Sequence, residues 1–138
     1  MVVTREITLD TQGRCHLVDI TLQVAAEVAR SGVRDGIVNI FVVGSTAGVG
    51  TTENEPGLLR DTEELWERLV ASDTGYHHDL AWGDGNGFSH LRAGLMGPSL
   101  TIPFSAGKMA LGTWQQVVLA DFDNRPRHRQ VVLQIMGE

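Results

Sequence analysis

The spacing of hydrophobic and polar positions changes several times along the chain, and each change predicts a different element. Residues 2–9 and 129–136 alternate with a period of two, which is typical of strands. Residues 36–43 (GIVNIFVV) form a continuous apolar run and predict a strand that is covered on both faces. Residues 20–30 and 57–70 instead repeat their apolar positions at helical spacing, so we expect a helix in each.

The other segments are shorter, and turn residues separate them. We expect short strands at residues 15–18 and 100–104, a strand at 110–122 and a short helix at 90–95. Residues 46–54 fit a glycine- and threonine-rich strand or loop, and residues 72–88 are rich in turns. Strands dominate both ends without strict alternation with helices, which predicts the α+β class. The expected architecture is two packed, mainly antiparallel β-sheets with two or three helices, in a single domain over residues 1–138.

Length, charge and cysteine content exclude several classes of protein. A chain of 138 residues is too short for a (β/α)₈ barrel, which needs about 250 residues. The net charge of −6 argues against sequence-independent nucleic-acid binding, which requires an excess of Lys and Arg. Cys15 is the single cysteine, so the chain forms no intramolecular disulfide and no cysteine-rich zinc module. No apolar run resembles a signal peptide or reaches the roughly 20 residues of a membrane helix, so we expect a cytoplasmic protein without a membrane partner.

Histidines and a carboxylate gather in the turn-rich segment and shortly after it. His78 and Asp79 are adjacent, and His90 follows about a dozen residues later. Neutral imidazole and carboxylate are good ligands for zinc-like ions, so His78 and His90 are candidate metal ligands. The spacing matches neither H-E-x-x-H nor C-x-x-C. Loop histidines that hydrogen-bond the backbone are the alternative interpretation.

Two further groups could contact a substrate. Glu53 lies among Thr and Asn residues, where a carboxylate could bind a metal, act as a base or recognise an amino group. Arg127 and Arg129 alternate on a predicted strand, so both face one side and could clamp a phosphate. Pairing with the surplus acids, across strands or across a subunit boundary, is the alternative. Trp114 lies within the strand predicted at 110–122, where an indole is usually part of the core.

Several of these segments together resemble one family. The blocks Ser99–Phe104 (SLTIPF) and Leu111–Gln116 (LGTWQQ), with Gly107 between them, are similar to the signature of the YjbQ-like family, whose members are commonly named secondary thiamine-phosphate synthases. Further matches, reaching from about residue 4 to the C-terminus, are Tyr76-x-His78-Asp79, Asp84-Gly85-Asn86, Ser89-His90-Leu91, Glu53-Asn54-Glu55 and Arg127-x-Arg129.

The resemblance implies an α+β fold, a homotrimer and a metal-associated pocket close to or between subunits. The implied reaction condenses an aminopyrimidine methyl diphosphate with a thiazole phosphate, forms thiamine phosphate and releases pyrophosphate, as a weak activity. On this hypothesis a divalent ion of the zinc or magnesium class is held by His78 and His90 and stabilises the charge of the leaving group. The other residues assigned to the site are Glu53 and Asp79 as catalytic residues, and Asn86, Arg127 and Arg129 as contacts to the phosphorylated substrate.

The chain departs from the family pattern at one position. Many members carry a His in an H-T-S-A motif where this chain has Gly44, followed by Ser45-Thr46-Ala47. If that imidazole is a metal ligand, then Glu53, Asp79 or water must replace it here. Two alternatives to the synthase stay open: a metal-dependent hydrolase or other phosphate-handling enzyme with an unidentified substrate, and a non-enzymatic ligand-binding trimer.

Overall fold

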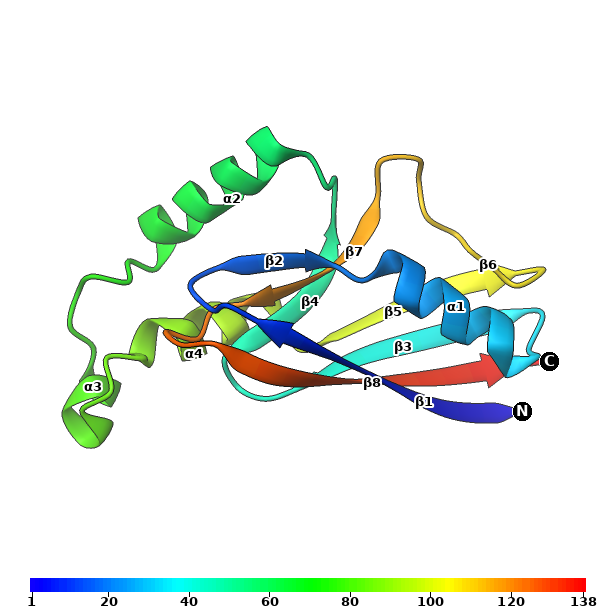
Figure 1. The fold of residues 1–138 in the computed structure, drawn as a ribbon, viewed down its shortest axis with the longest axis horizontal. Helices are drawn as coiled ribbons and strands as arrows, with labels where there is room; N and C mark the ends of the chain where they lie inside the picture. Colours follow the sequence, from blue (N-terminus) through cyan, green and yellow to red (C-terminus); the bar gives the residue numbers. More distant parts are fainter.

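Five of the strands build one antiparallel sheet, shown in Figure 1. The structure is a computed structural model that describes residues 1–138. The strands follow one another across the sheet in the order β1 (Val2–Thr11), β8 (Arg127–Gly137), β3 (Gly36–Val43), β5 (Ser99–Ser105) and β6 (Lys108–Met109). Every neighbouring pair is antiparallel, which confirms the expected sheet type.

The three remaining strands form a second antiparallel sheet, in the order β2 (His16–Asp19), β7 (Gln116–Asp121) and β4 (Ala47–Thr52). Its inner face and the helix α1 (Thr21–Ser31) pack on the five-stranded sheet, and all three share one cluster of buried side chains. Val24 and Val28 of α1 are fully buried there, as the helical spacing of the sequence predicts. The α+β class with two packed sheets is therefore confirmed.

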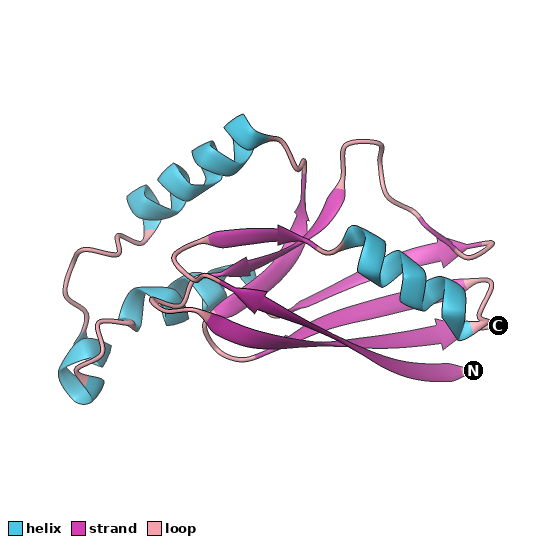
Figure 2. Cartoon of the chain, viewed as in Figure 1, coloured by secondary structure: helices cyan, strands magenta, loops and turns pink.

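The chain has four helices, one more than the largest number expected. Figure 2 shows α2 (Pro56–Leu69), α3 (His77–Trp82) and α4 (Gly87–Met96) at the end of the sheets away from both termini. The additional helix, α3, has six residues and lies in the segment expected to contain only turns. None of the four helices is both long enough and apolar enough to cross a bilayer.

Two predictions about strands are wrong in detail. The strand predicted at 110–122 begins only at Gln116, because residues 112–115 form a turn. In this turn the backbone amide of Gln115 donates to Gly112 O at 3.0 Å, and the Gln115 side-chain oxygen accepts from Gly112 N at 3.1 Å. Trp114 is consequently in a loop and 73% exposed rather than in the core. The second error concerns β3, which is covered on one face only: Ile37 and Phe41 point to the open face of the sheet and are 40% and 41% exposed.

Glycine in β4 serves a close approach within the chain. A Cβ at Gly48 would lie 2.9 Å from Gly97 O and 3.0 Å from the Met96 side chain. The C-terminal end of α4 can therefore lie directly on β4, where Val49 N donates to Gly97 O at 3.0 Å. This contact fixes the orientation of α4, which carries one of the candidate histidines.

Candidate metal centre

His78, Asp79 and Asp84 form a compact group at the junction of α3 and α4. One ligand-type atom from each of the three lies within 4.8 Å of the other two. His78 Nδ1 is 3.8 Å from Asp79 Oδ1 and 3.6 Å from Asp84 Oδ1. His90 lies beside them on α4, with its ring centroid 4.6 Å from that of His78, although it does not belong to this group of mutually close ligand atoms. The structure thus brings together the two histidines and the aspartate singled out in the sequence, and it adds Asp84.

Asp79 holds the junction of the two helices in place. Its Oδ2 accepts a hydrogen bond from Tyr76 N at 3.1 Å, which caps the start of α3. Its Oδ1 accepts from Gly87 N at 2.9 Å, at the start of α4. A Cβ at Gly87 would lie 2.9 Å from Tyr76 Cβ and 3.2 Å from His78 Cβ. Glycine at this position is therefore what allows α3 and α4 to meet.

The negative charge of Asp79 suits a cation. The pKa of the Asp79 carboxyl is lowered, and the hydrogen bond from Gly87 N is the largest cause. The hydrogen bond from Tyr76 N and the nearby His78 also lower this pKa, and together these effects outweigh desolvation, which raises it. His78 Nδ1 is buried and is the only fully buried side-chain nitrogen or oxygen without a hydrogen-bond partner. An orphaned imidazole nitrogen beside two carboxylate oxygens fits a divalent ion as the missing partner.

Asn86 anchors the loop that carries Asp84. Its Oδ1 accepts from Ser89 Oγ at 2.6 Å and from Asn124 N at 3.1 Å. Asn124 Nδ2 in turn donates to Asp84 O at 2.7 Å, so the turn between β7 and β8 supports the cluster from outside. Asn86 is 7% exposed, and its Nδ2 makes no hydrogen bond. This amide nitrogen is the group that Asn86 can offer to a substrate.

Arg127 and Arg129 lie on one face of β8, but their surroundings differ. Arg129 is buried, and Nε and Nη2 donate to the two oxygens of Asp121 at 2.6 and 2.9 Å. Arg127 is half-buried, with Nε 3.7 Å from Asp123 Oδ2. Ion pairing with acids, one of the alternatives considered for the cluster, is therefore present at both arginines.

Gly44 leaves one nitrogen of Arg129 open. A Cβ at residue 44 would lie 2.7 Å from Arg129 Nη1, so a larger residue in this backbone geometry would compete with the guanidinium for space. Nη1 makes no hydrogen bond and is not among the fully buried unpaired atoms, so it is the accessible part of a side chain that is 4% exposed. Gly44, the position where the family resemblance led us to expect a His, therefore lies beside the one nitrogen of Arg129 that has no partner.

Glu53 lies away from this cluster within one chain. It directly follows β4, and α2 then leads towards α3 (Figure 1). The 14 residues of α2 span roughly 21 Å. Glu53 instead lines an open cavity together with Asp19, Trp114 and Gln116. The structure therefore groups His78, Asp79 and His90, and it places Glu53 elsewhere.

Sequence reasoning missed Asp84 as a site residue. Its carboxylate accepts from Asn86 N at 3.2 Å in a tight turn, and the flanking Gly83 and Gly85 both have positive φ. The signal was present in the sequence as an aspartate between two glycines, which is a turn pattern. That pattern predicts a turn, but it does not predict that the turn places the Asp84 carboxylate next to His78.

These features define a class of protein: a two-sheet α+β domain with a histidine–aspartate cluster where its short helices meet. The chain belongs to the family described as "UPF0047 protein YjbQ-like", whose model matches residues 5–138. A "UPF0047 protein" of Methanothermobacter thermautotrophicus is 42% identical, over 99% of this chain and 94% of that protein.

Solved structures agree with this assignment. The crystal structure of a protein from Sulfolobus solfataricus, described as YbjQ-like and of unknown function, has a TM-score of 0.94 and 34% identity, covering 100% of this chain and 99% of that one. A protein of the YjbQ/UPF0047 family from Clostridium acetobutylicum has a TM-score of 0.87 and 34% identity, covering 96% and 99%. The family resemblance and the fold are thus both confirmed, while these relatives name no activity.

Proposed function

We propose that this protein is a divalent-metal enzyme that acts on a small phosphorylated substrate, with weak thiamine-phosphate synthase activity. The observation that carries the proposal is the orphaned, buried His78 Nδ1 beside Asp79 and Asp84. Since a buried polar atom without a partner is costly, a ligand at this point supplies the missing interaction. We place the protein in the cytoplasm.

The proposed metal ligands are His78 and His90, with Asp79 and Asp84 as carboxylate donors. Two imidazoles beside two carboxylates favour an ion of the zinc class over magnesium, which prefers oxygen ligands alone. When bound, such an ion offsets the negative charge that develops on a departing diphosphate. Asp79 also positions His78, because its hydrogen bonds to Tyr76 N and Gly87 N fix the place where α3 meets α4.

Arg129 is the proposed phosphate-binding residue. Its Nη1 lies beside Gly44 and has no hydrogen-bond partner, while Asp121 holds the other side of the guanidinium. A guanidinium that is already oriented loses little freedom when it binds an anion. Arg127, which is half-exposed on the same face, and Asn86 Nδ2 are the further proposed contacts to the substrate.

In the proposed reaction the thiazole nitrogen attacks the methylene carbon of the aminopyrimidine, and the bond from that carbon to oxygen breaks. Pyrophosphate leaves with the bonding electrons. Because no proton needs to move in this step, the site needs cations more than it needs a base. Glu53 is the proposed contact to the amino group of the pyrimidine.

A homotrimer with pockets shared between subunits accounts for the distance between Glu53 and the histidines. Trp114 is 73% exposed close to Glu53, and Phe41 is 41% exposed on the open face of the large sheet. Large apolar side chains at a surface are typical of interfaces. In such a trimer Glu53 from one subunit faces the metal centre of the next.

Pyrophosphate release from the two synthase substrates, measured with added zinc, tests the proposal. We expect slow release, and a drop of at least about 100-fold in the variants His78→Ala and His90→Ala, as is typical for lost catalytic groups. His16→Ala is the matched control, since His16 lies in β2 and not in the cluster.

The alternatives give different results. Hydrolysis of a member of a phosphorylated-metabolite panel, with no release from the synthase substrates, identifies a hydrolase. Thermal stabilisation by the substrates without turnover identifies a binding protein. Release that is unchanged in His78→Ala contradicts the assigned site.

A further inference from the structure

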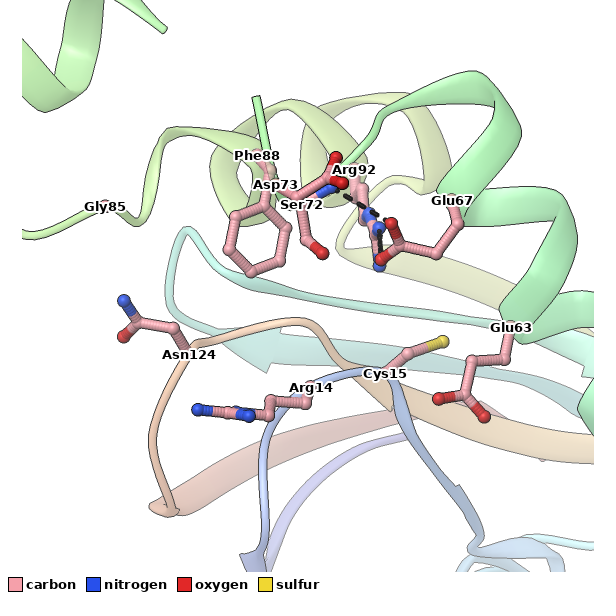
Figure 3. A pocket seen from close by; sticks show the side chains of 10 residues that line it. All are labelled: Arg14, Cys15, Glu63, Glu67, Ser72, Asp73, Gly85, Phe88, Arg92 and Asn124. Atoms are coloured by element: carbon pink, nitrogen blue, oxygen red, sulfur yellow. Dashed lines mark hydrogen bonds and ion pairs between the residues drawn. The ribbon is translucent and has the colours of Figure 1, made fainter. Parts of the chain in front are cut away.

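A second cavity, separate from the metal centre, lies beneath the C-terminal half of α2 (Figure 3). Its volume is about 410 Å³, within the range of small-molecule sites. The walls come from α2, from α4, and from the turns β1–β2 and β7–β8. None of His78, Asp79, Asp84 and His90 lines it. This cavity therefore has no role in the proposed metal centre.

Arg92 supplies one free donor to the cavity. Its side chain is 2% exposed, and it is fixed by hydrogen bonds from Nε and Nη2 to Val70 O and from Nη2 to Glu67 Oε1. Nη1 has no hydrogen-bond partner, yet it is not among the fully buried unpaired atoms. Because almost nothing else of Arg92 is accessible, Nη1 is the part that can meet an anion in the cavity.

Arg14 supplies a second guanidinium from the opposite wall (Figure 3). Arg14 and Cys15 both have positive φ, at 56° and 60°, a conformation that non-glycine residues rarely adopt. Arg14 N donates to Asp123 O at 2.7 Å, which holds the strained turn in place. Such a conformation persists only where the surrounding structure holds it. The Arg14 side chain forms no ion pair and is available for a ligand.

Three carboxylates line the same cavity: Glu63, Glu67 and Asp73. Glu67 is paired with Arg92 at 2.7 Å, whereas Glu63 and Asp73 form no ion pair. Burial raises the pKa of Cys15 to about 11, so the thiol is neutral at physiological pH. The cavity therefore offers donors for one anionic group, acceptors for cationic groups, and more acidic than basic side chains.

We propose that this cavity binds a free amino acid with a basic side chain. Its carboxylate contacts Arg92 Nη1 and Arg14, and its ammonium groups contact Glu63 and Asp73. Two guanidiniums against three carboxylates favour a ligand that is itself positively charged overall while still carrying an anionic group. The ring of Phe88 and the Cys15 thiol provide the neutral part of the wall.

Calorimetric titration of the intact protein with L-lysine tests the proposal. We expect L-lysine binding to saturate at ligand concentrations up to roughly 10 mM, a range in which a millimolar Kd can be measured. Two probes separate the contributions: 1,5-diaminopentane lacks the carboxylate, and L-glutamate adds a negative charge. Each is expected to bind at least about tenfold more weakly than L-lysine. No saturable binding of L-lysine, or equal binding of L-glutamate, overturns the proposal.

Substitutions in the cavity wall test where L-lysine binds. Arg14→Gln and Glu63→Gln are each expected to weaken L-lysine binding about tenfold or more. Arg60→Gln, on the exposed side of α2, and His90→Ala are expected to leave it unchanged. Unchanged L-lysine binding in Arg14→Gln or in Glu63→Gln overturns the assignment to this cavity.

Discussion

Two arginines, Arg92 and Arg129, are buried, and each is held by its own set of acceptors. Arg129 donates to both oxygens of Asp121, and Thr11 Oγ1 donates to the same carboxylate at 2.5 Å. Arg92 is bound by a backbone carbonyl and by Glu67, and it lies 5.0 Å from the centre of the Phe88 ring. In both residues Nη1 has no hydrogen-bond partner, so each arginine has a donor that can bind an anionic ligand.

The Asp121–Arg129 pair predicts a specific sensitivity to acid. Burial alone would raise the pKa of Asp121, but hydrogen bonds from Arg129, Thr11 and the Asp123 amide together lower it. A carboxyl with a lowered folded-state pKa contributes its stabilisation above the unfolded value of about 3.9 and loses it as the pH falls through the folded value. In urea unfolding, the free-energy difference between wild type and Asp121→Asn should therefore be constant near neutral pH and shrink below about pH 4.

Asp61→Asn provides the control for this titration, because Asp61 is exposed on α2 and forms no ion pair. Its difference from wild type should stay near zero at every pH. A difference for Asp121→Asn that does not change down to pH 3 would contradict the role given to the ion pair.

Part of the candidate site could be predicted from residue types alone. His78 and His90 could be identified because two imidazoles close to a carboxylate form a possible set of metal ligands, and the structure places their rings 4.6 Å apart. Asp84 could not be identified, since its position depends on the turn geometry of Gly83 and Gly85. The burial of Arg129 could not be predicted either, because an alternating pattern shows which residues share a face of a strand but not whether that face is buried.

At the scale of elements, the sheet depends on the close approach of β3 to β8. A Cβ at Gly36 would lie 2.0 Å from Met136 O and 2.9 Å from Gly137 Cα, and neither backbone atom can move independently. Gly36→Ala is therefore expected to lower the free energy of unfolding by about 1–3 kcal/mol, the usual cost of overpacking. Urea unfolding followed by circular dichroism measures this change.

Gly75→Ala is the matched control, since nothing lies within 4 Å of a Cβ at that position. It should be neutral or raise stability by a few tenths of a kcal/mol, because alanine restricts the unfolded chain. Equal stability of the two variants would contradict the close approach of the two strands at Gly36.

Long elements with a clear period could be predicted and short ones could not. The helix expected at 57–70 is α2 within one residue at each end, and the strand expected at 36–43 matches β3. α3 has only six residues and begins with a cap from Asp79, which a search for periodic apolar positions does not detect. The loop at 110–115 has strand-like composition, but its hydrogen bonds between Gly112 and Gln115 form a turn instead.

At the scale of the whole molecule, one face of the large sheet is uncovered and carries apolar side chains among polar ones such as Asn39 and Gln134. Ile37, Phe41, Val43 and Met136 are each between 40% and 45% exposed there. Exposed apolar side chains grouped on one face indicate a contact surface. Because we propose a homotrimer, we predict that light scattering after size-exclusion chromatography gives three times the 15.0 kDa of one chain.

Phe41→Glu should reduce this mass, because a charge in an apolar interface is costly. Leu22→Glu is the control: Leu22 is 82% exposed on α1, outside the uncovered sheet face, and the variant should keep the wild-type mass. A wild-type monomer, or an unchanged mass in Phe41→Glu, would contradict the assembly through this face.

The metal content of the untagged protein, purified without added metal or chelator, tests the metal centre directly. We expect elemental mass spectrometry to find about one divalent ion per chain, of the zinc class, held by His78 and His90 with the two aspartates. The variants His78→Ala and His90→Ala should lose the ion while keeping their circular dichroism, and His16→Ala should retain it. An ion retained in full by His90→Ala, or no ion in the wild-type protein even after incubation with zinc, would contradict the metal centre.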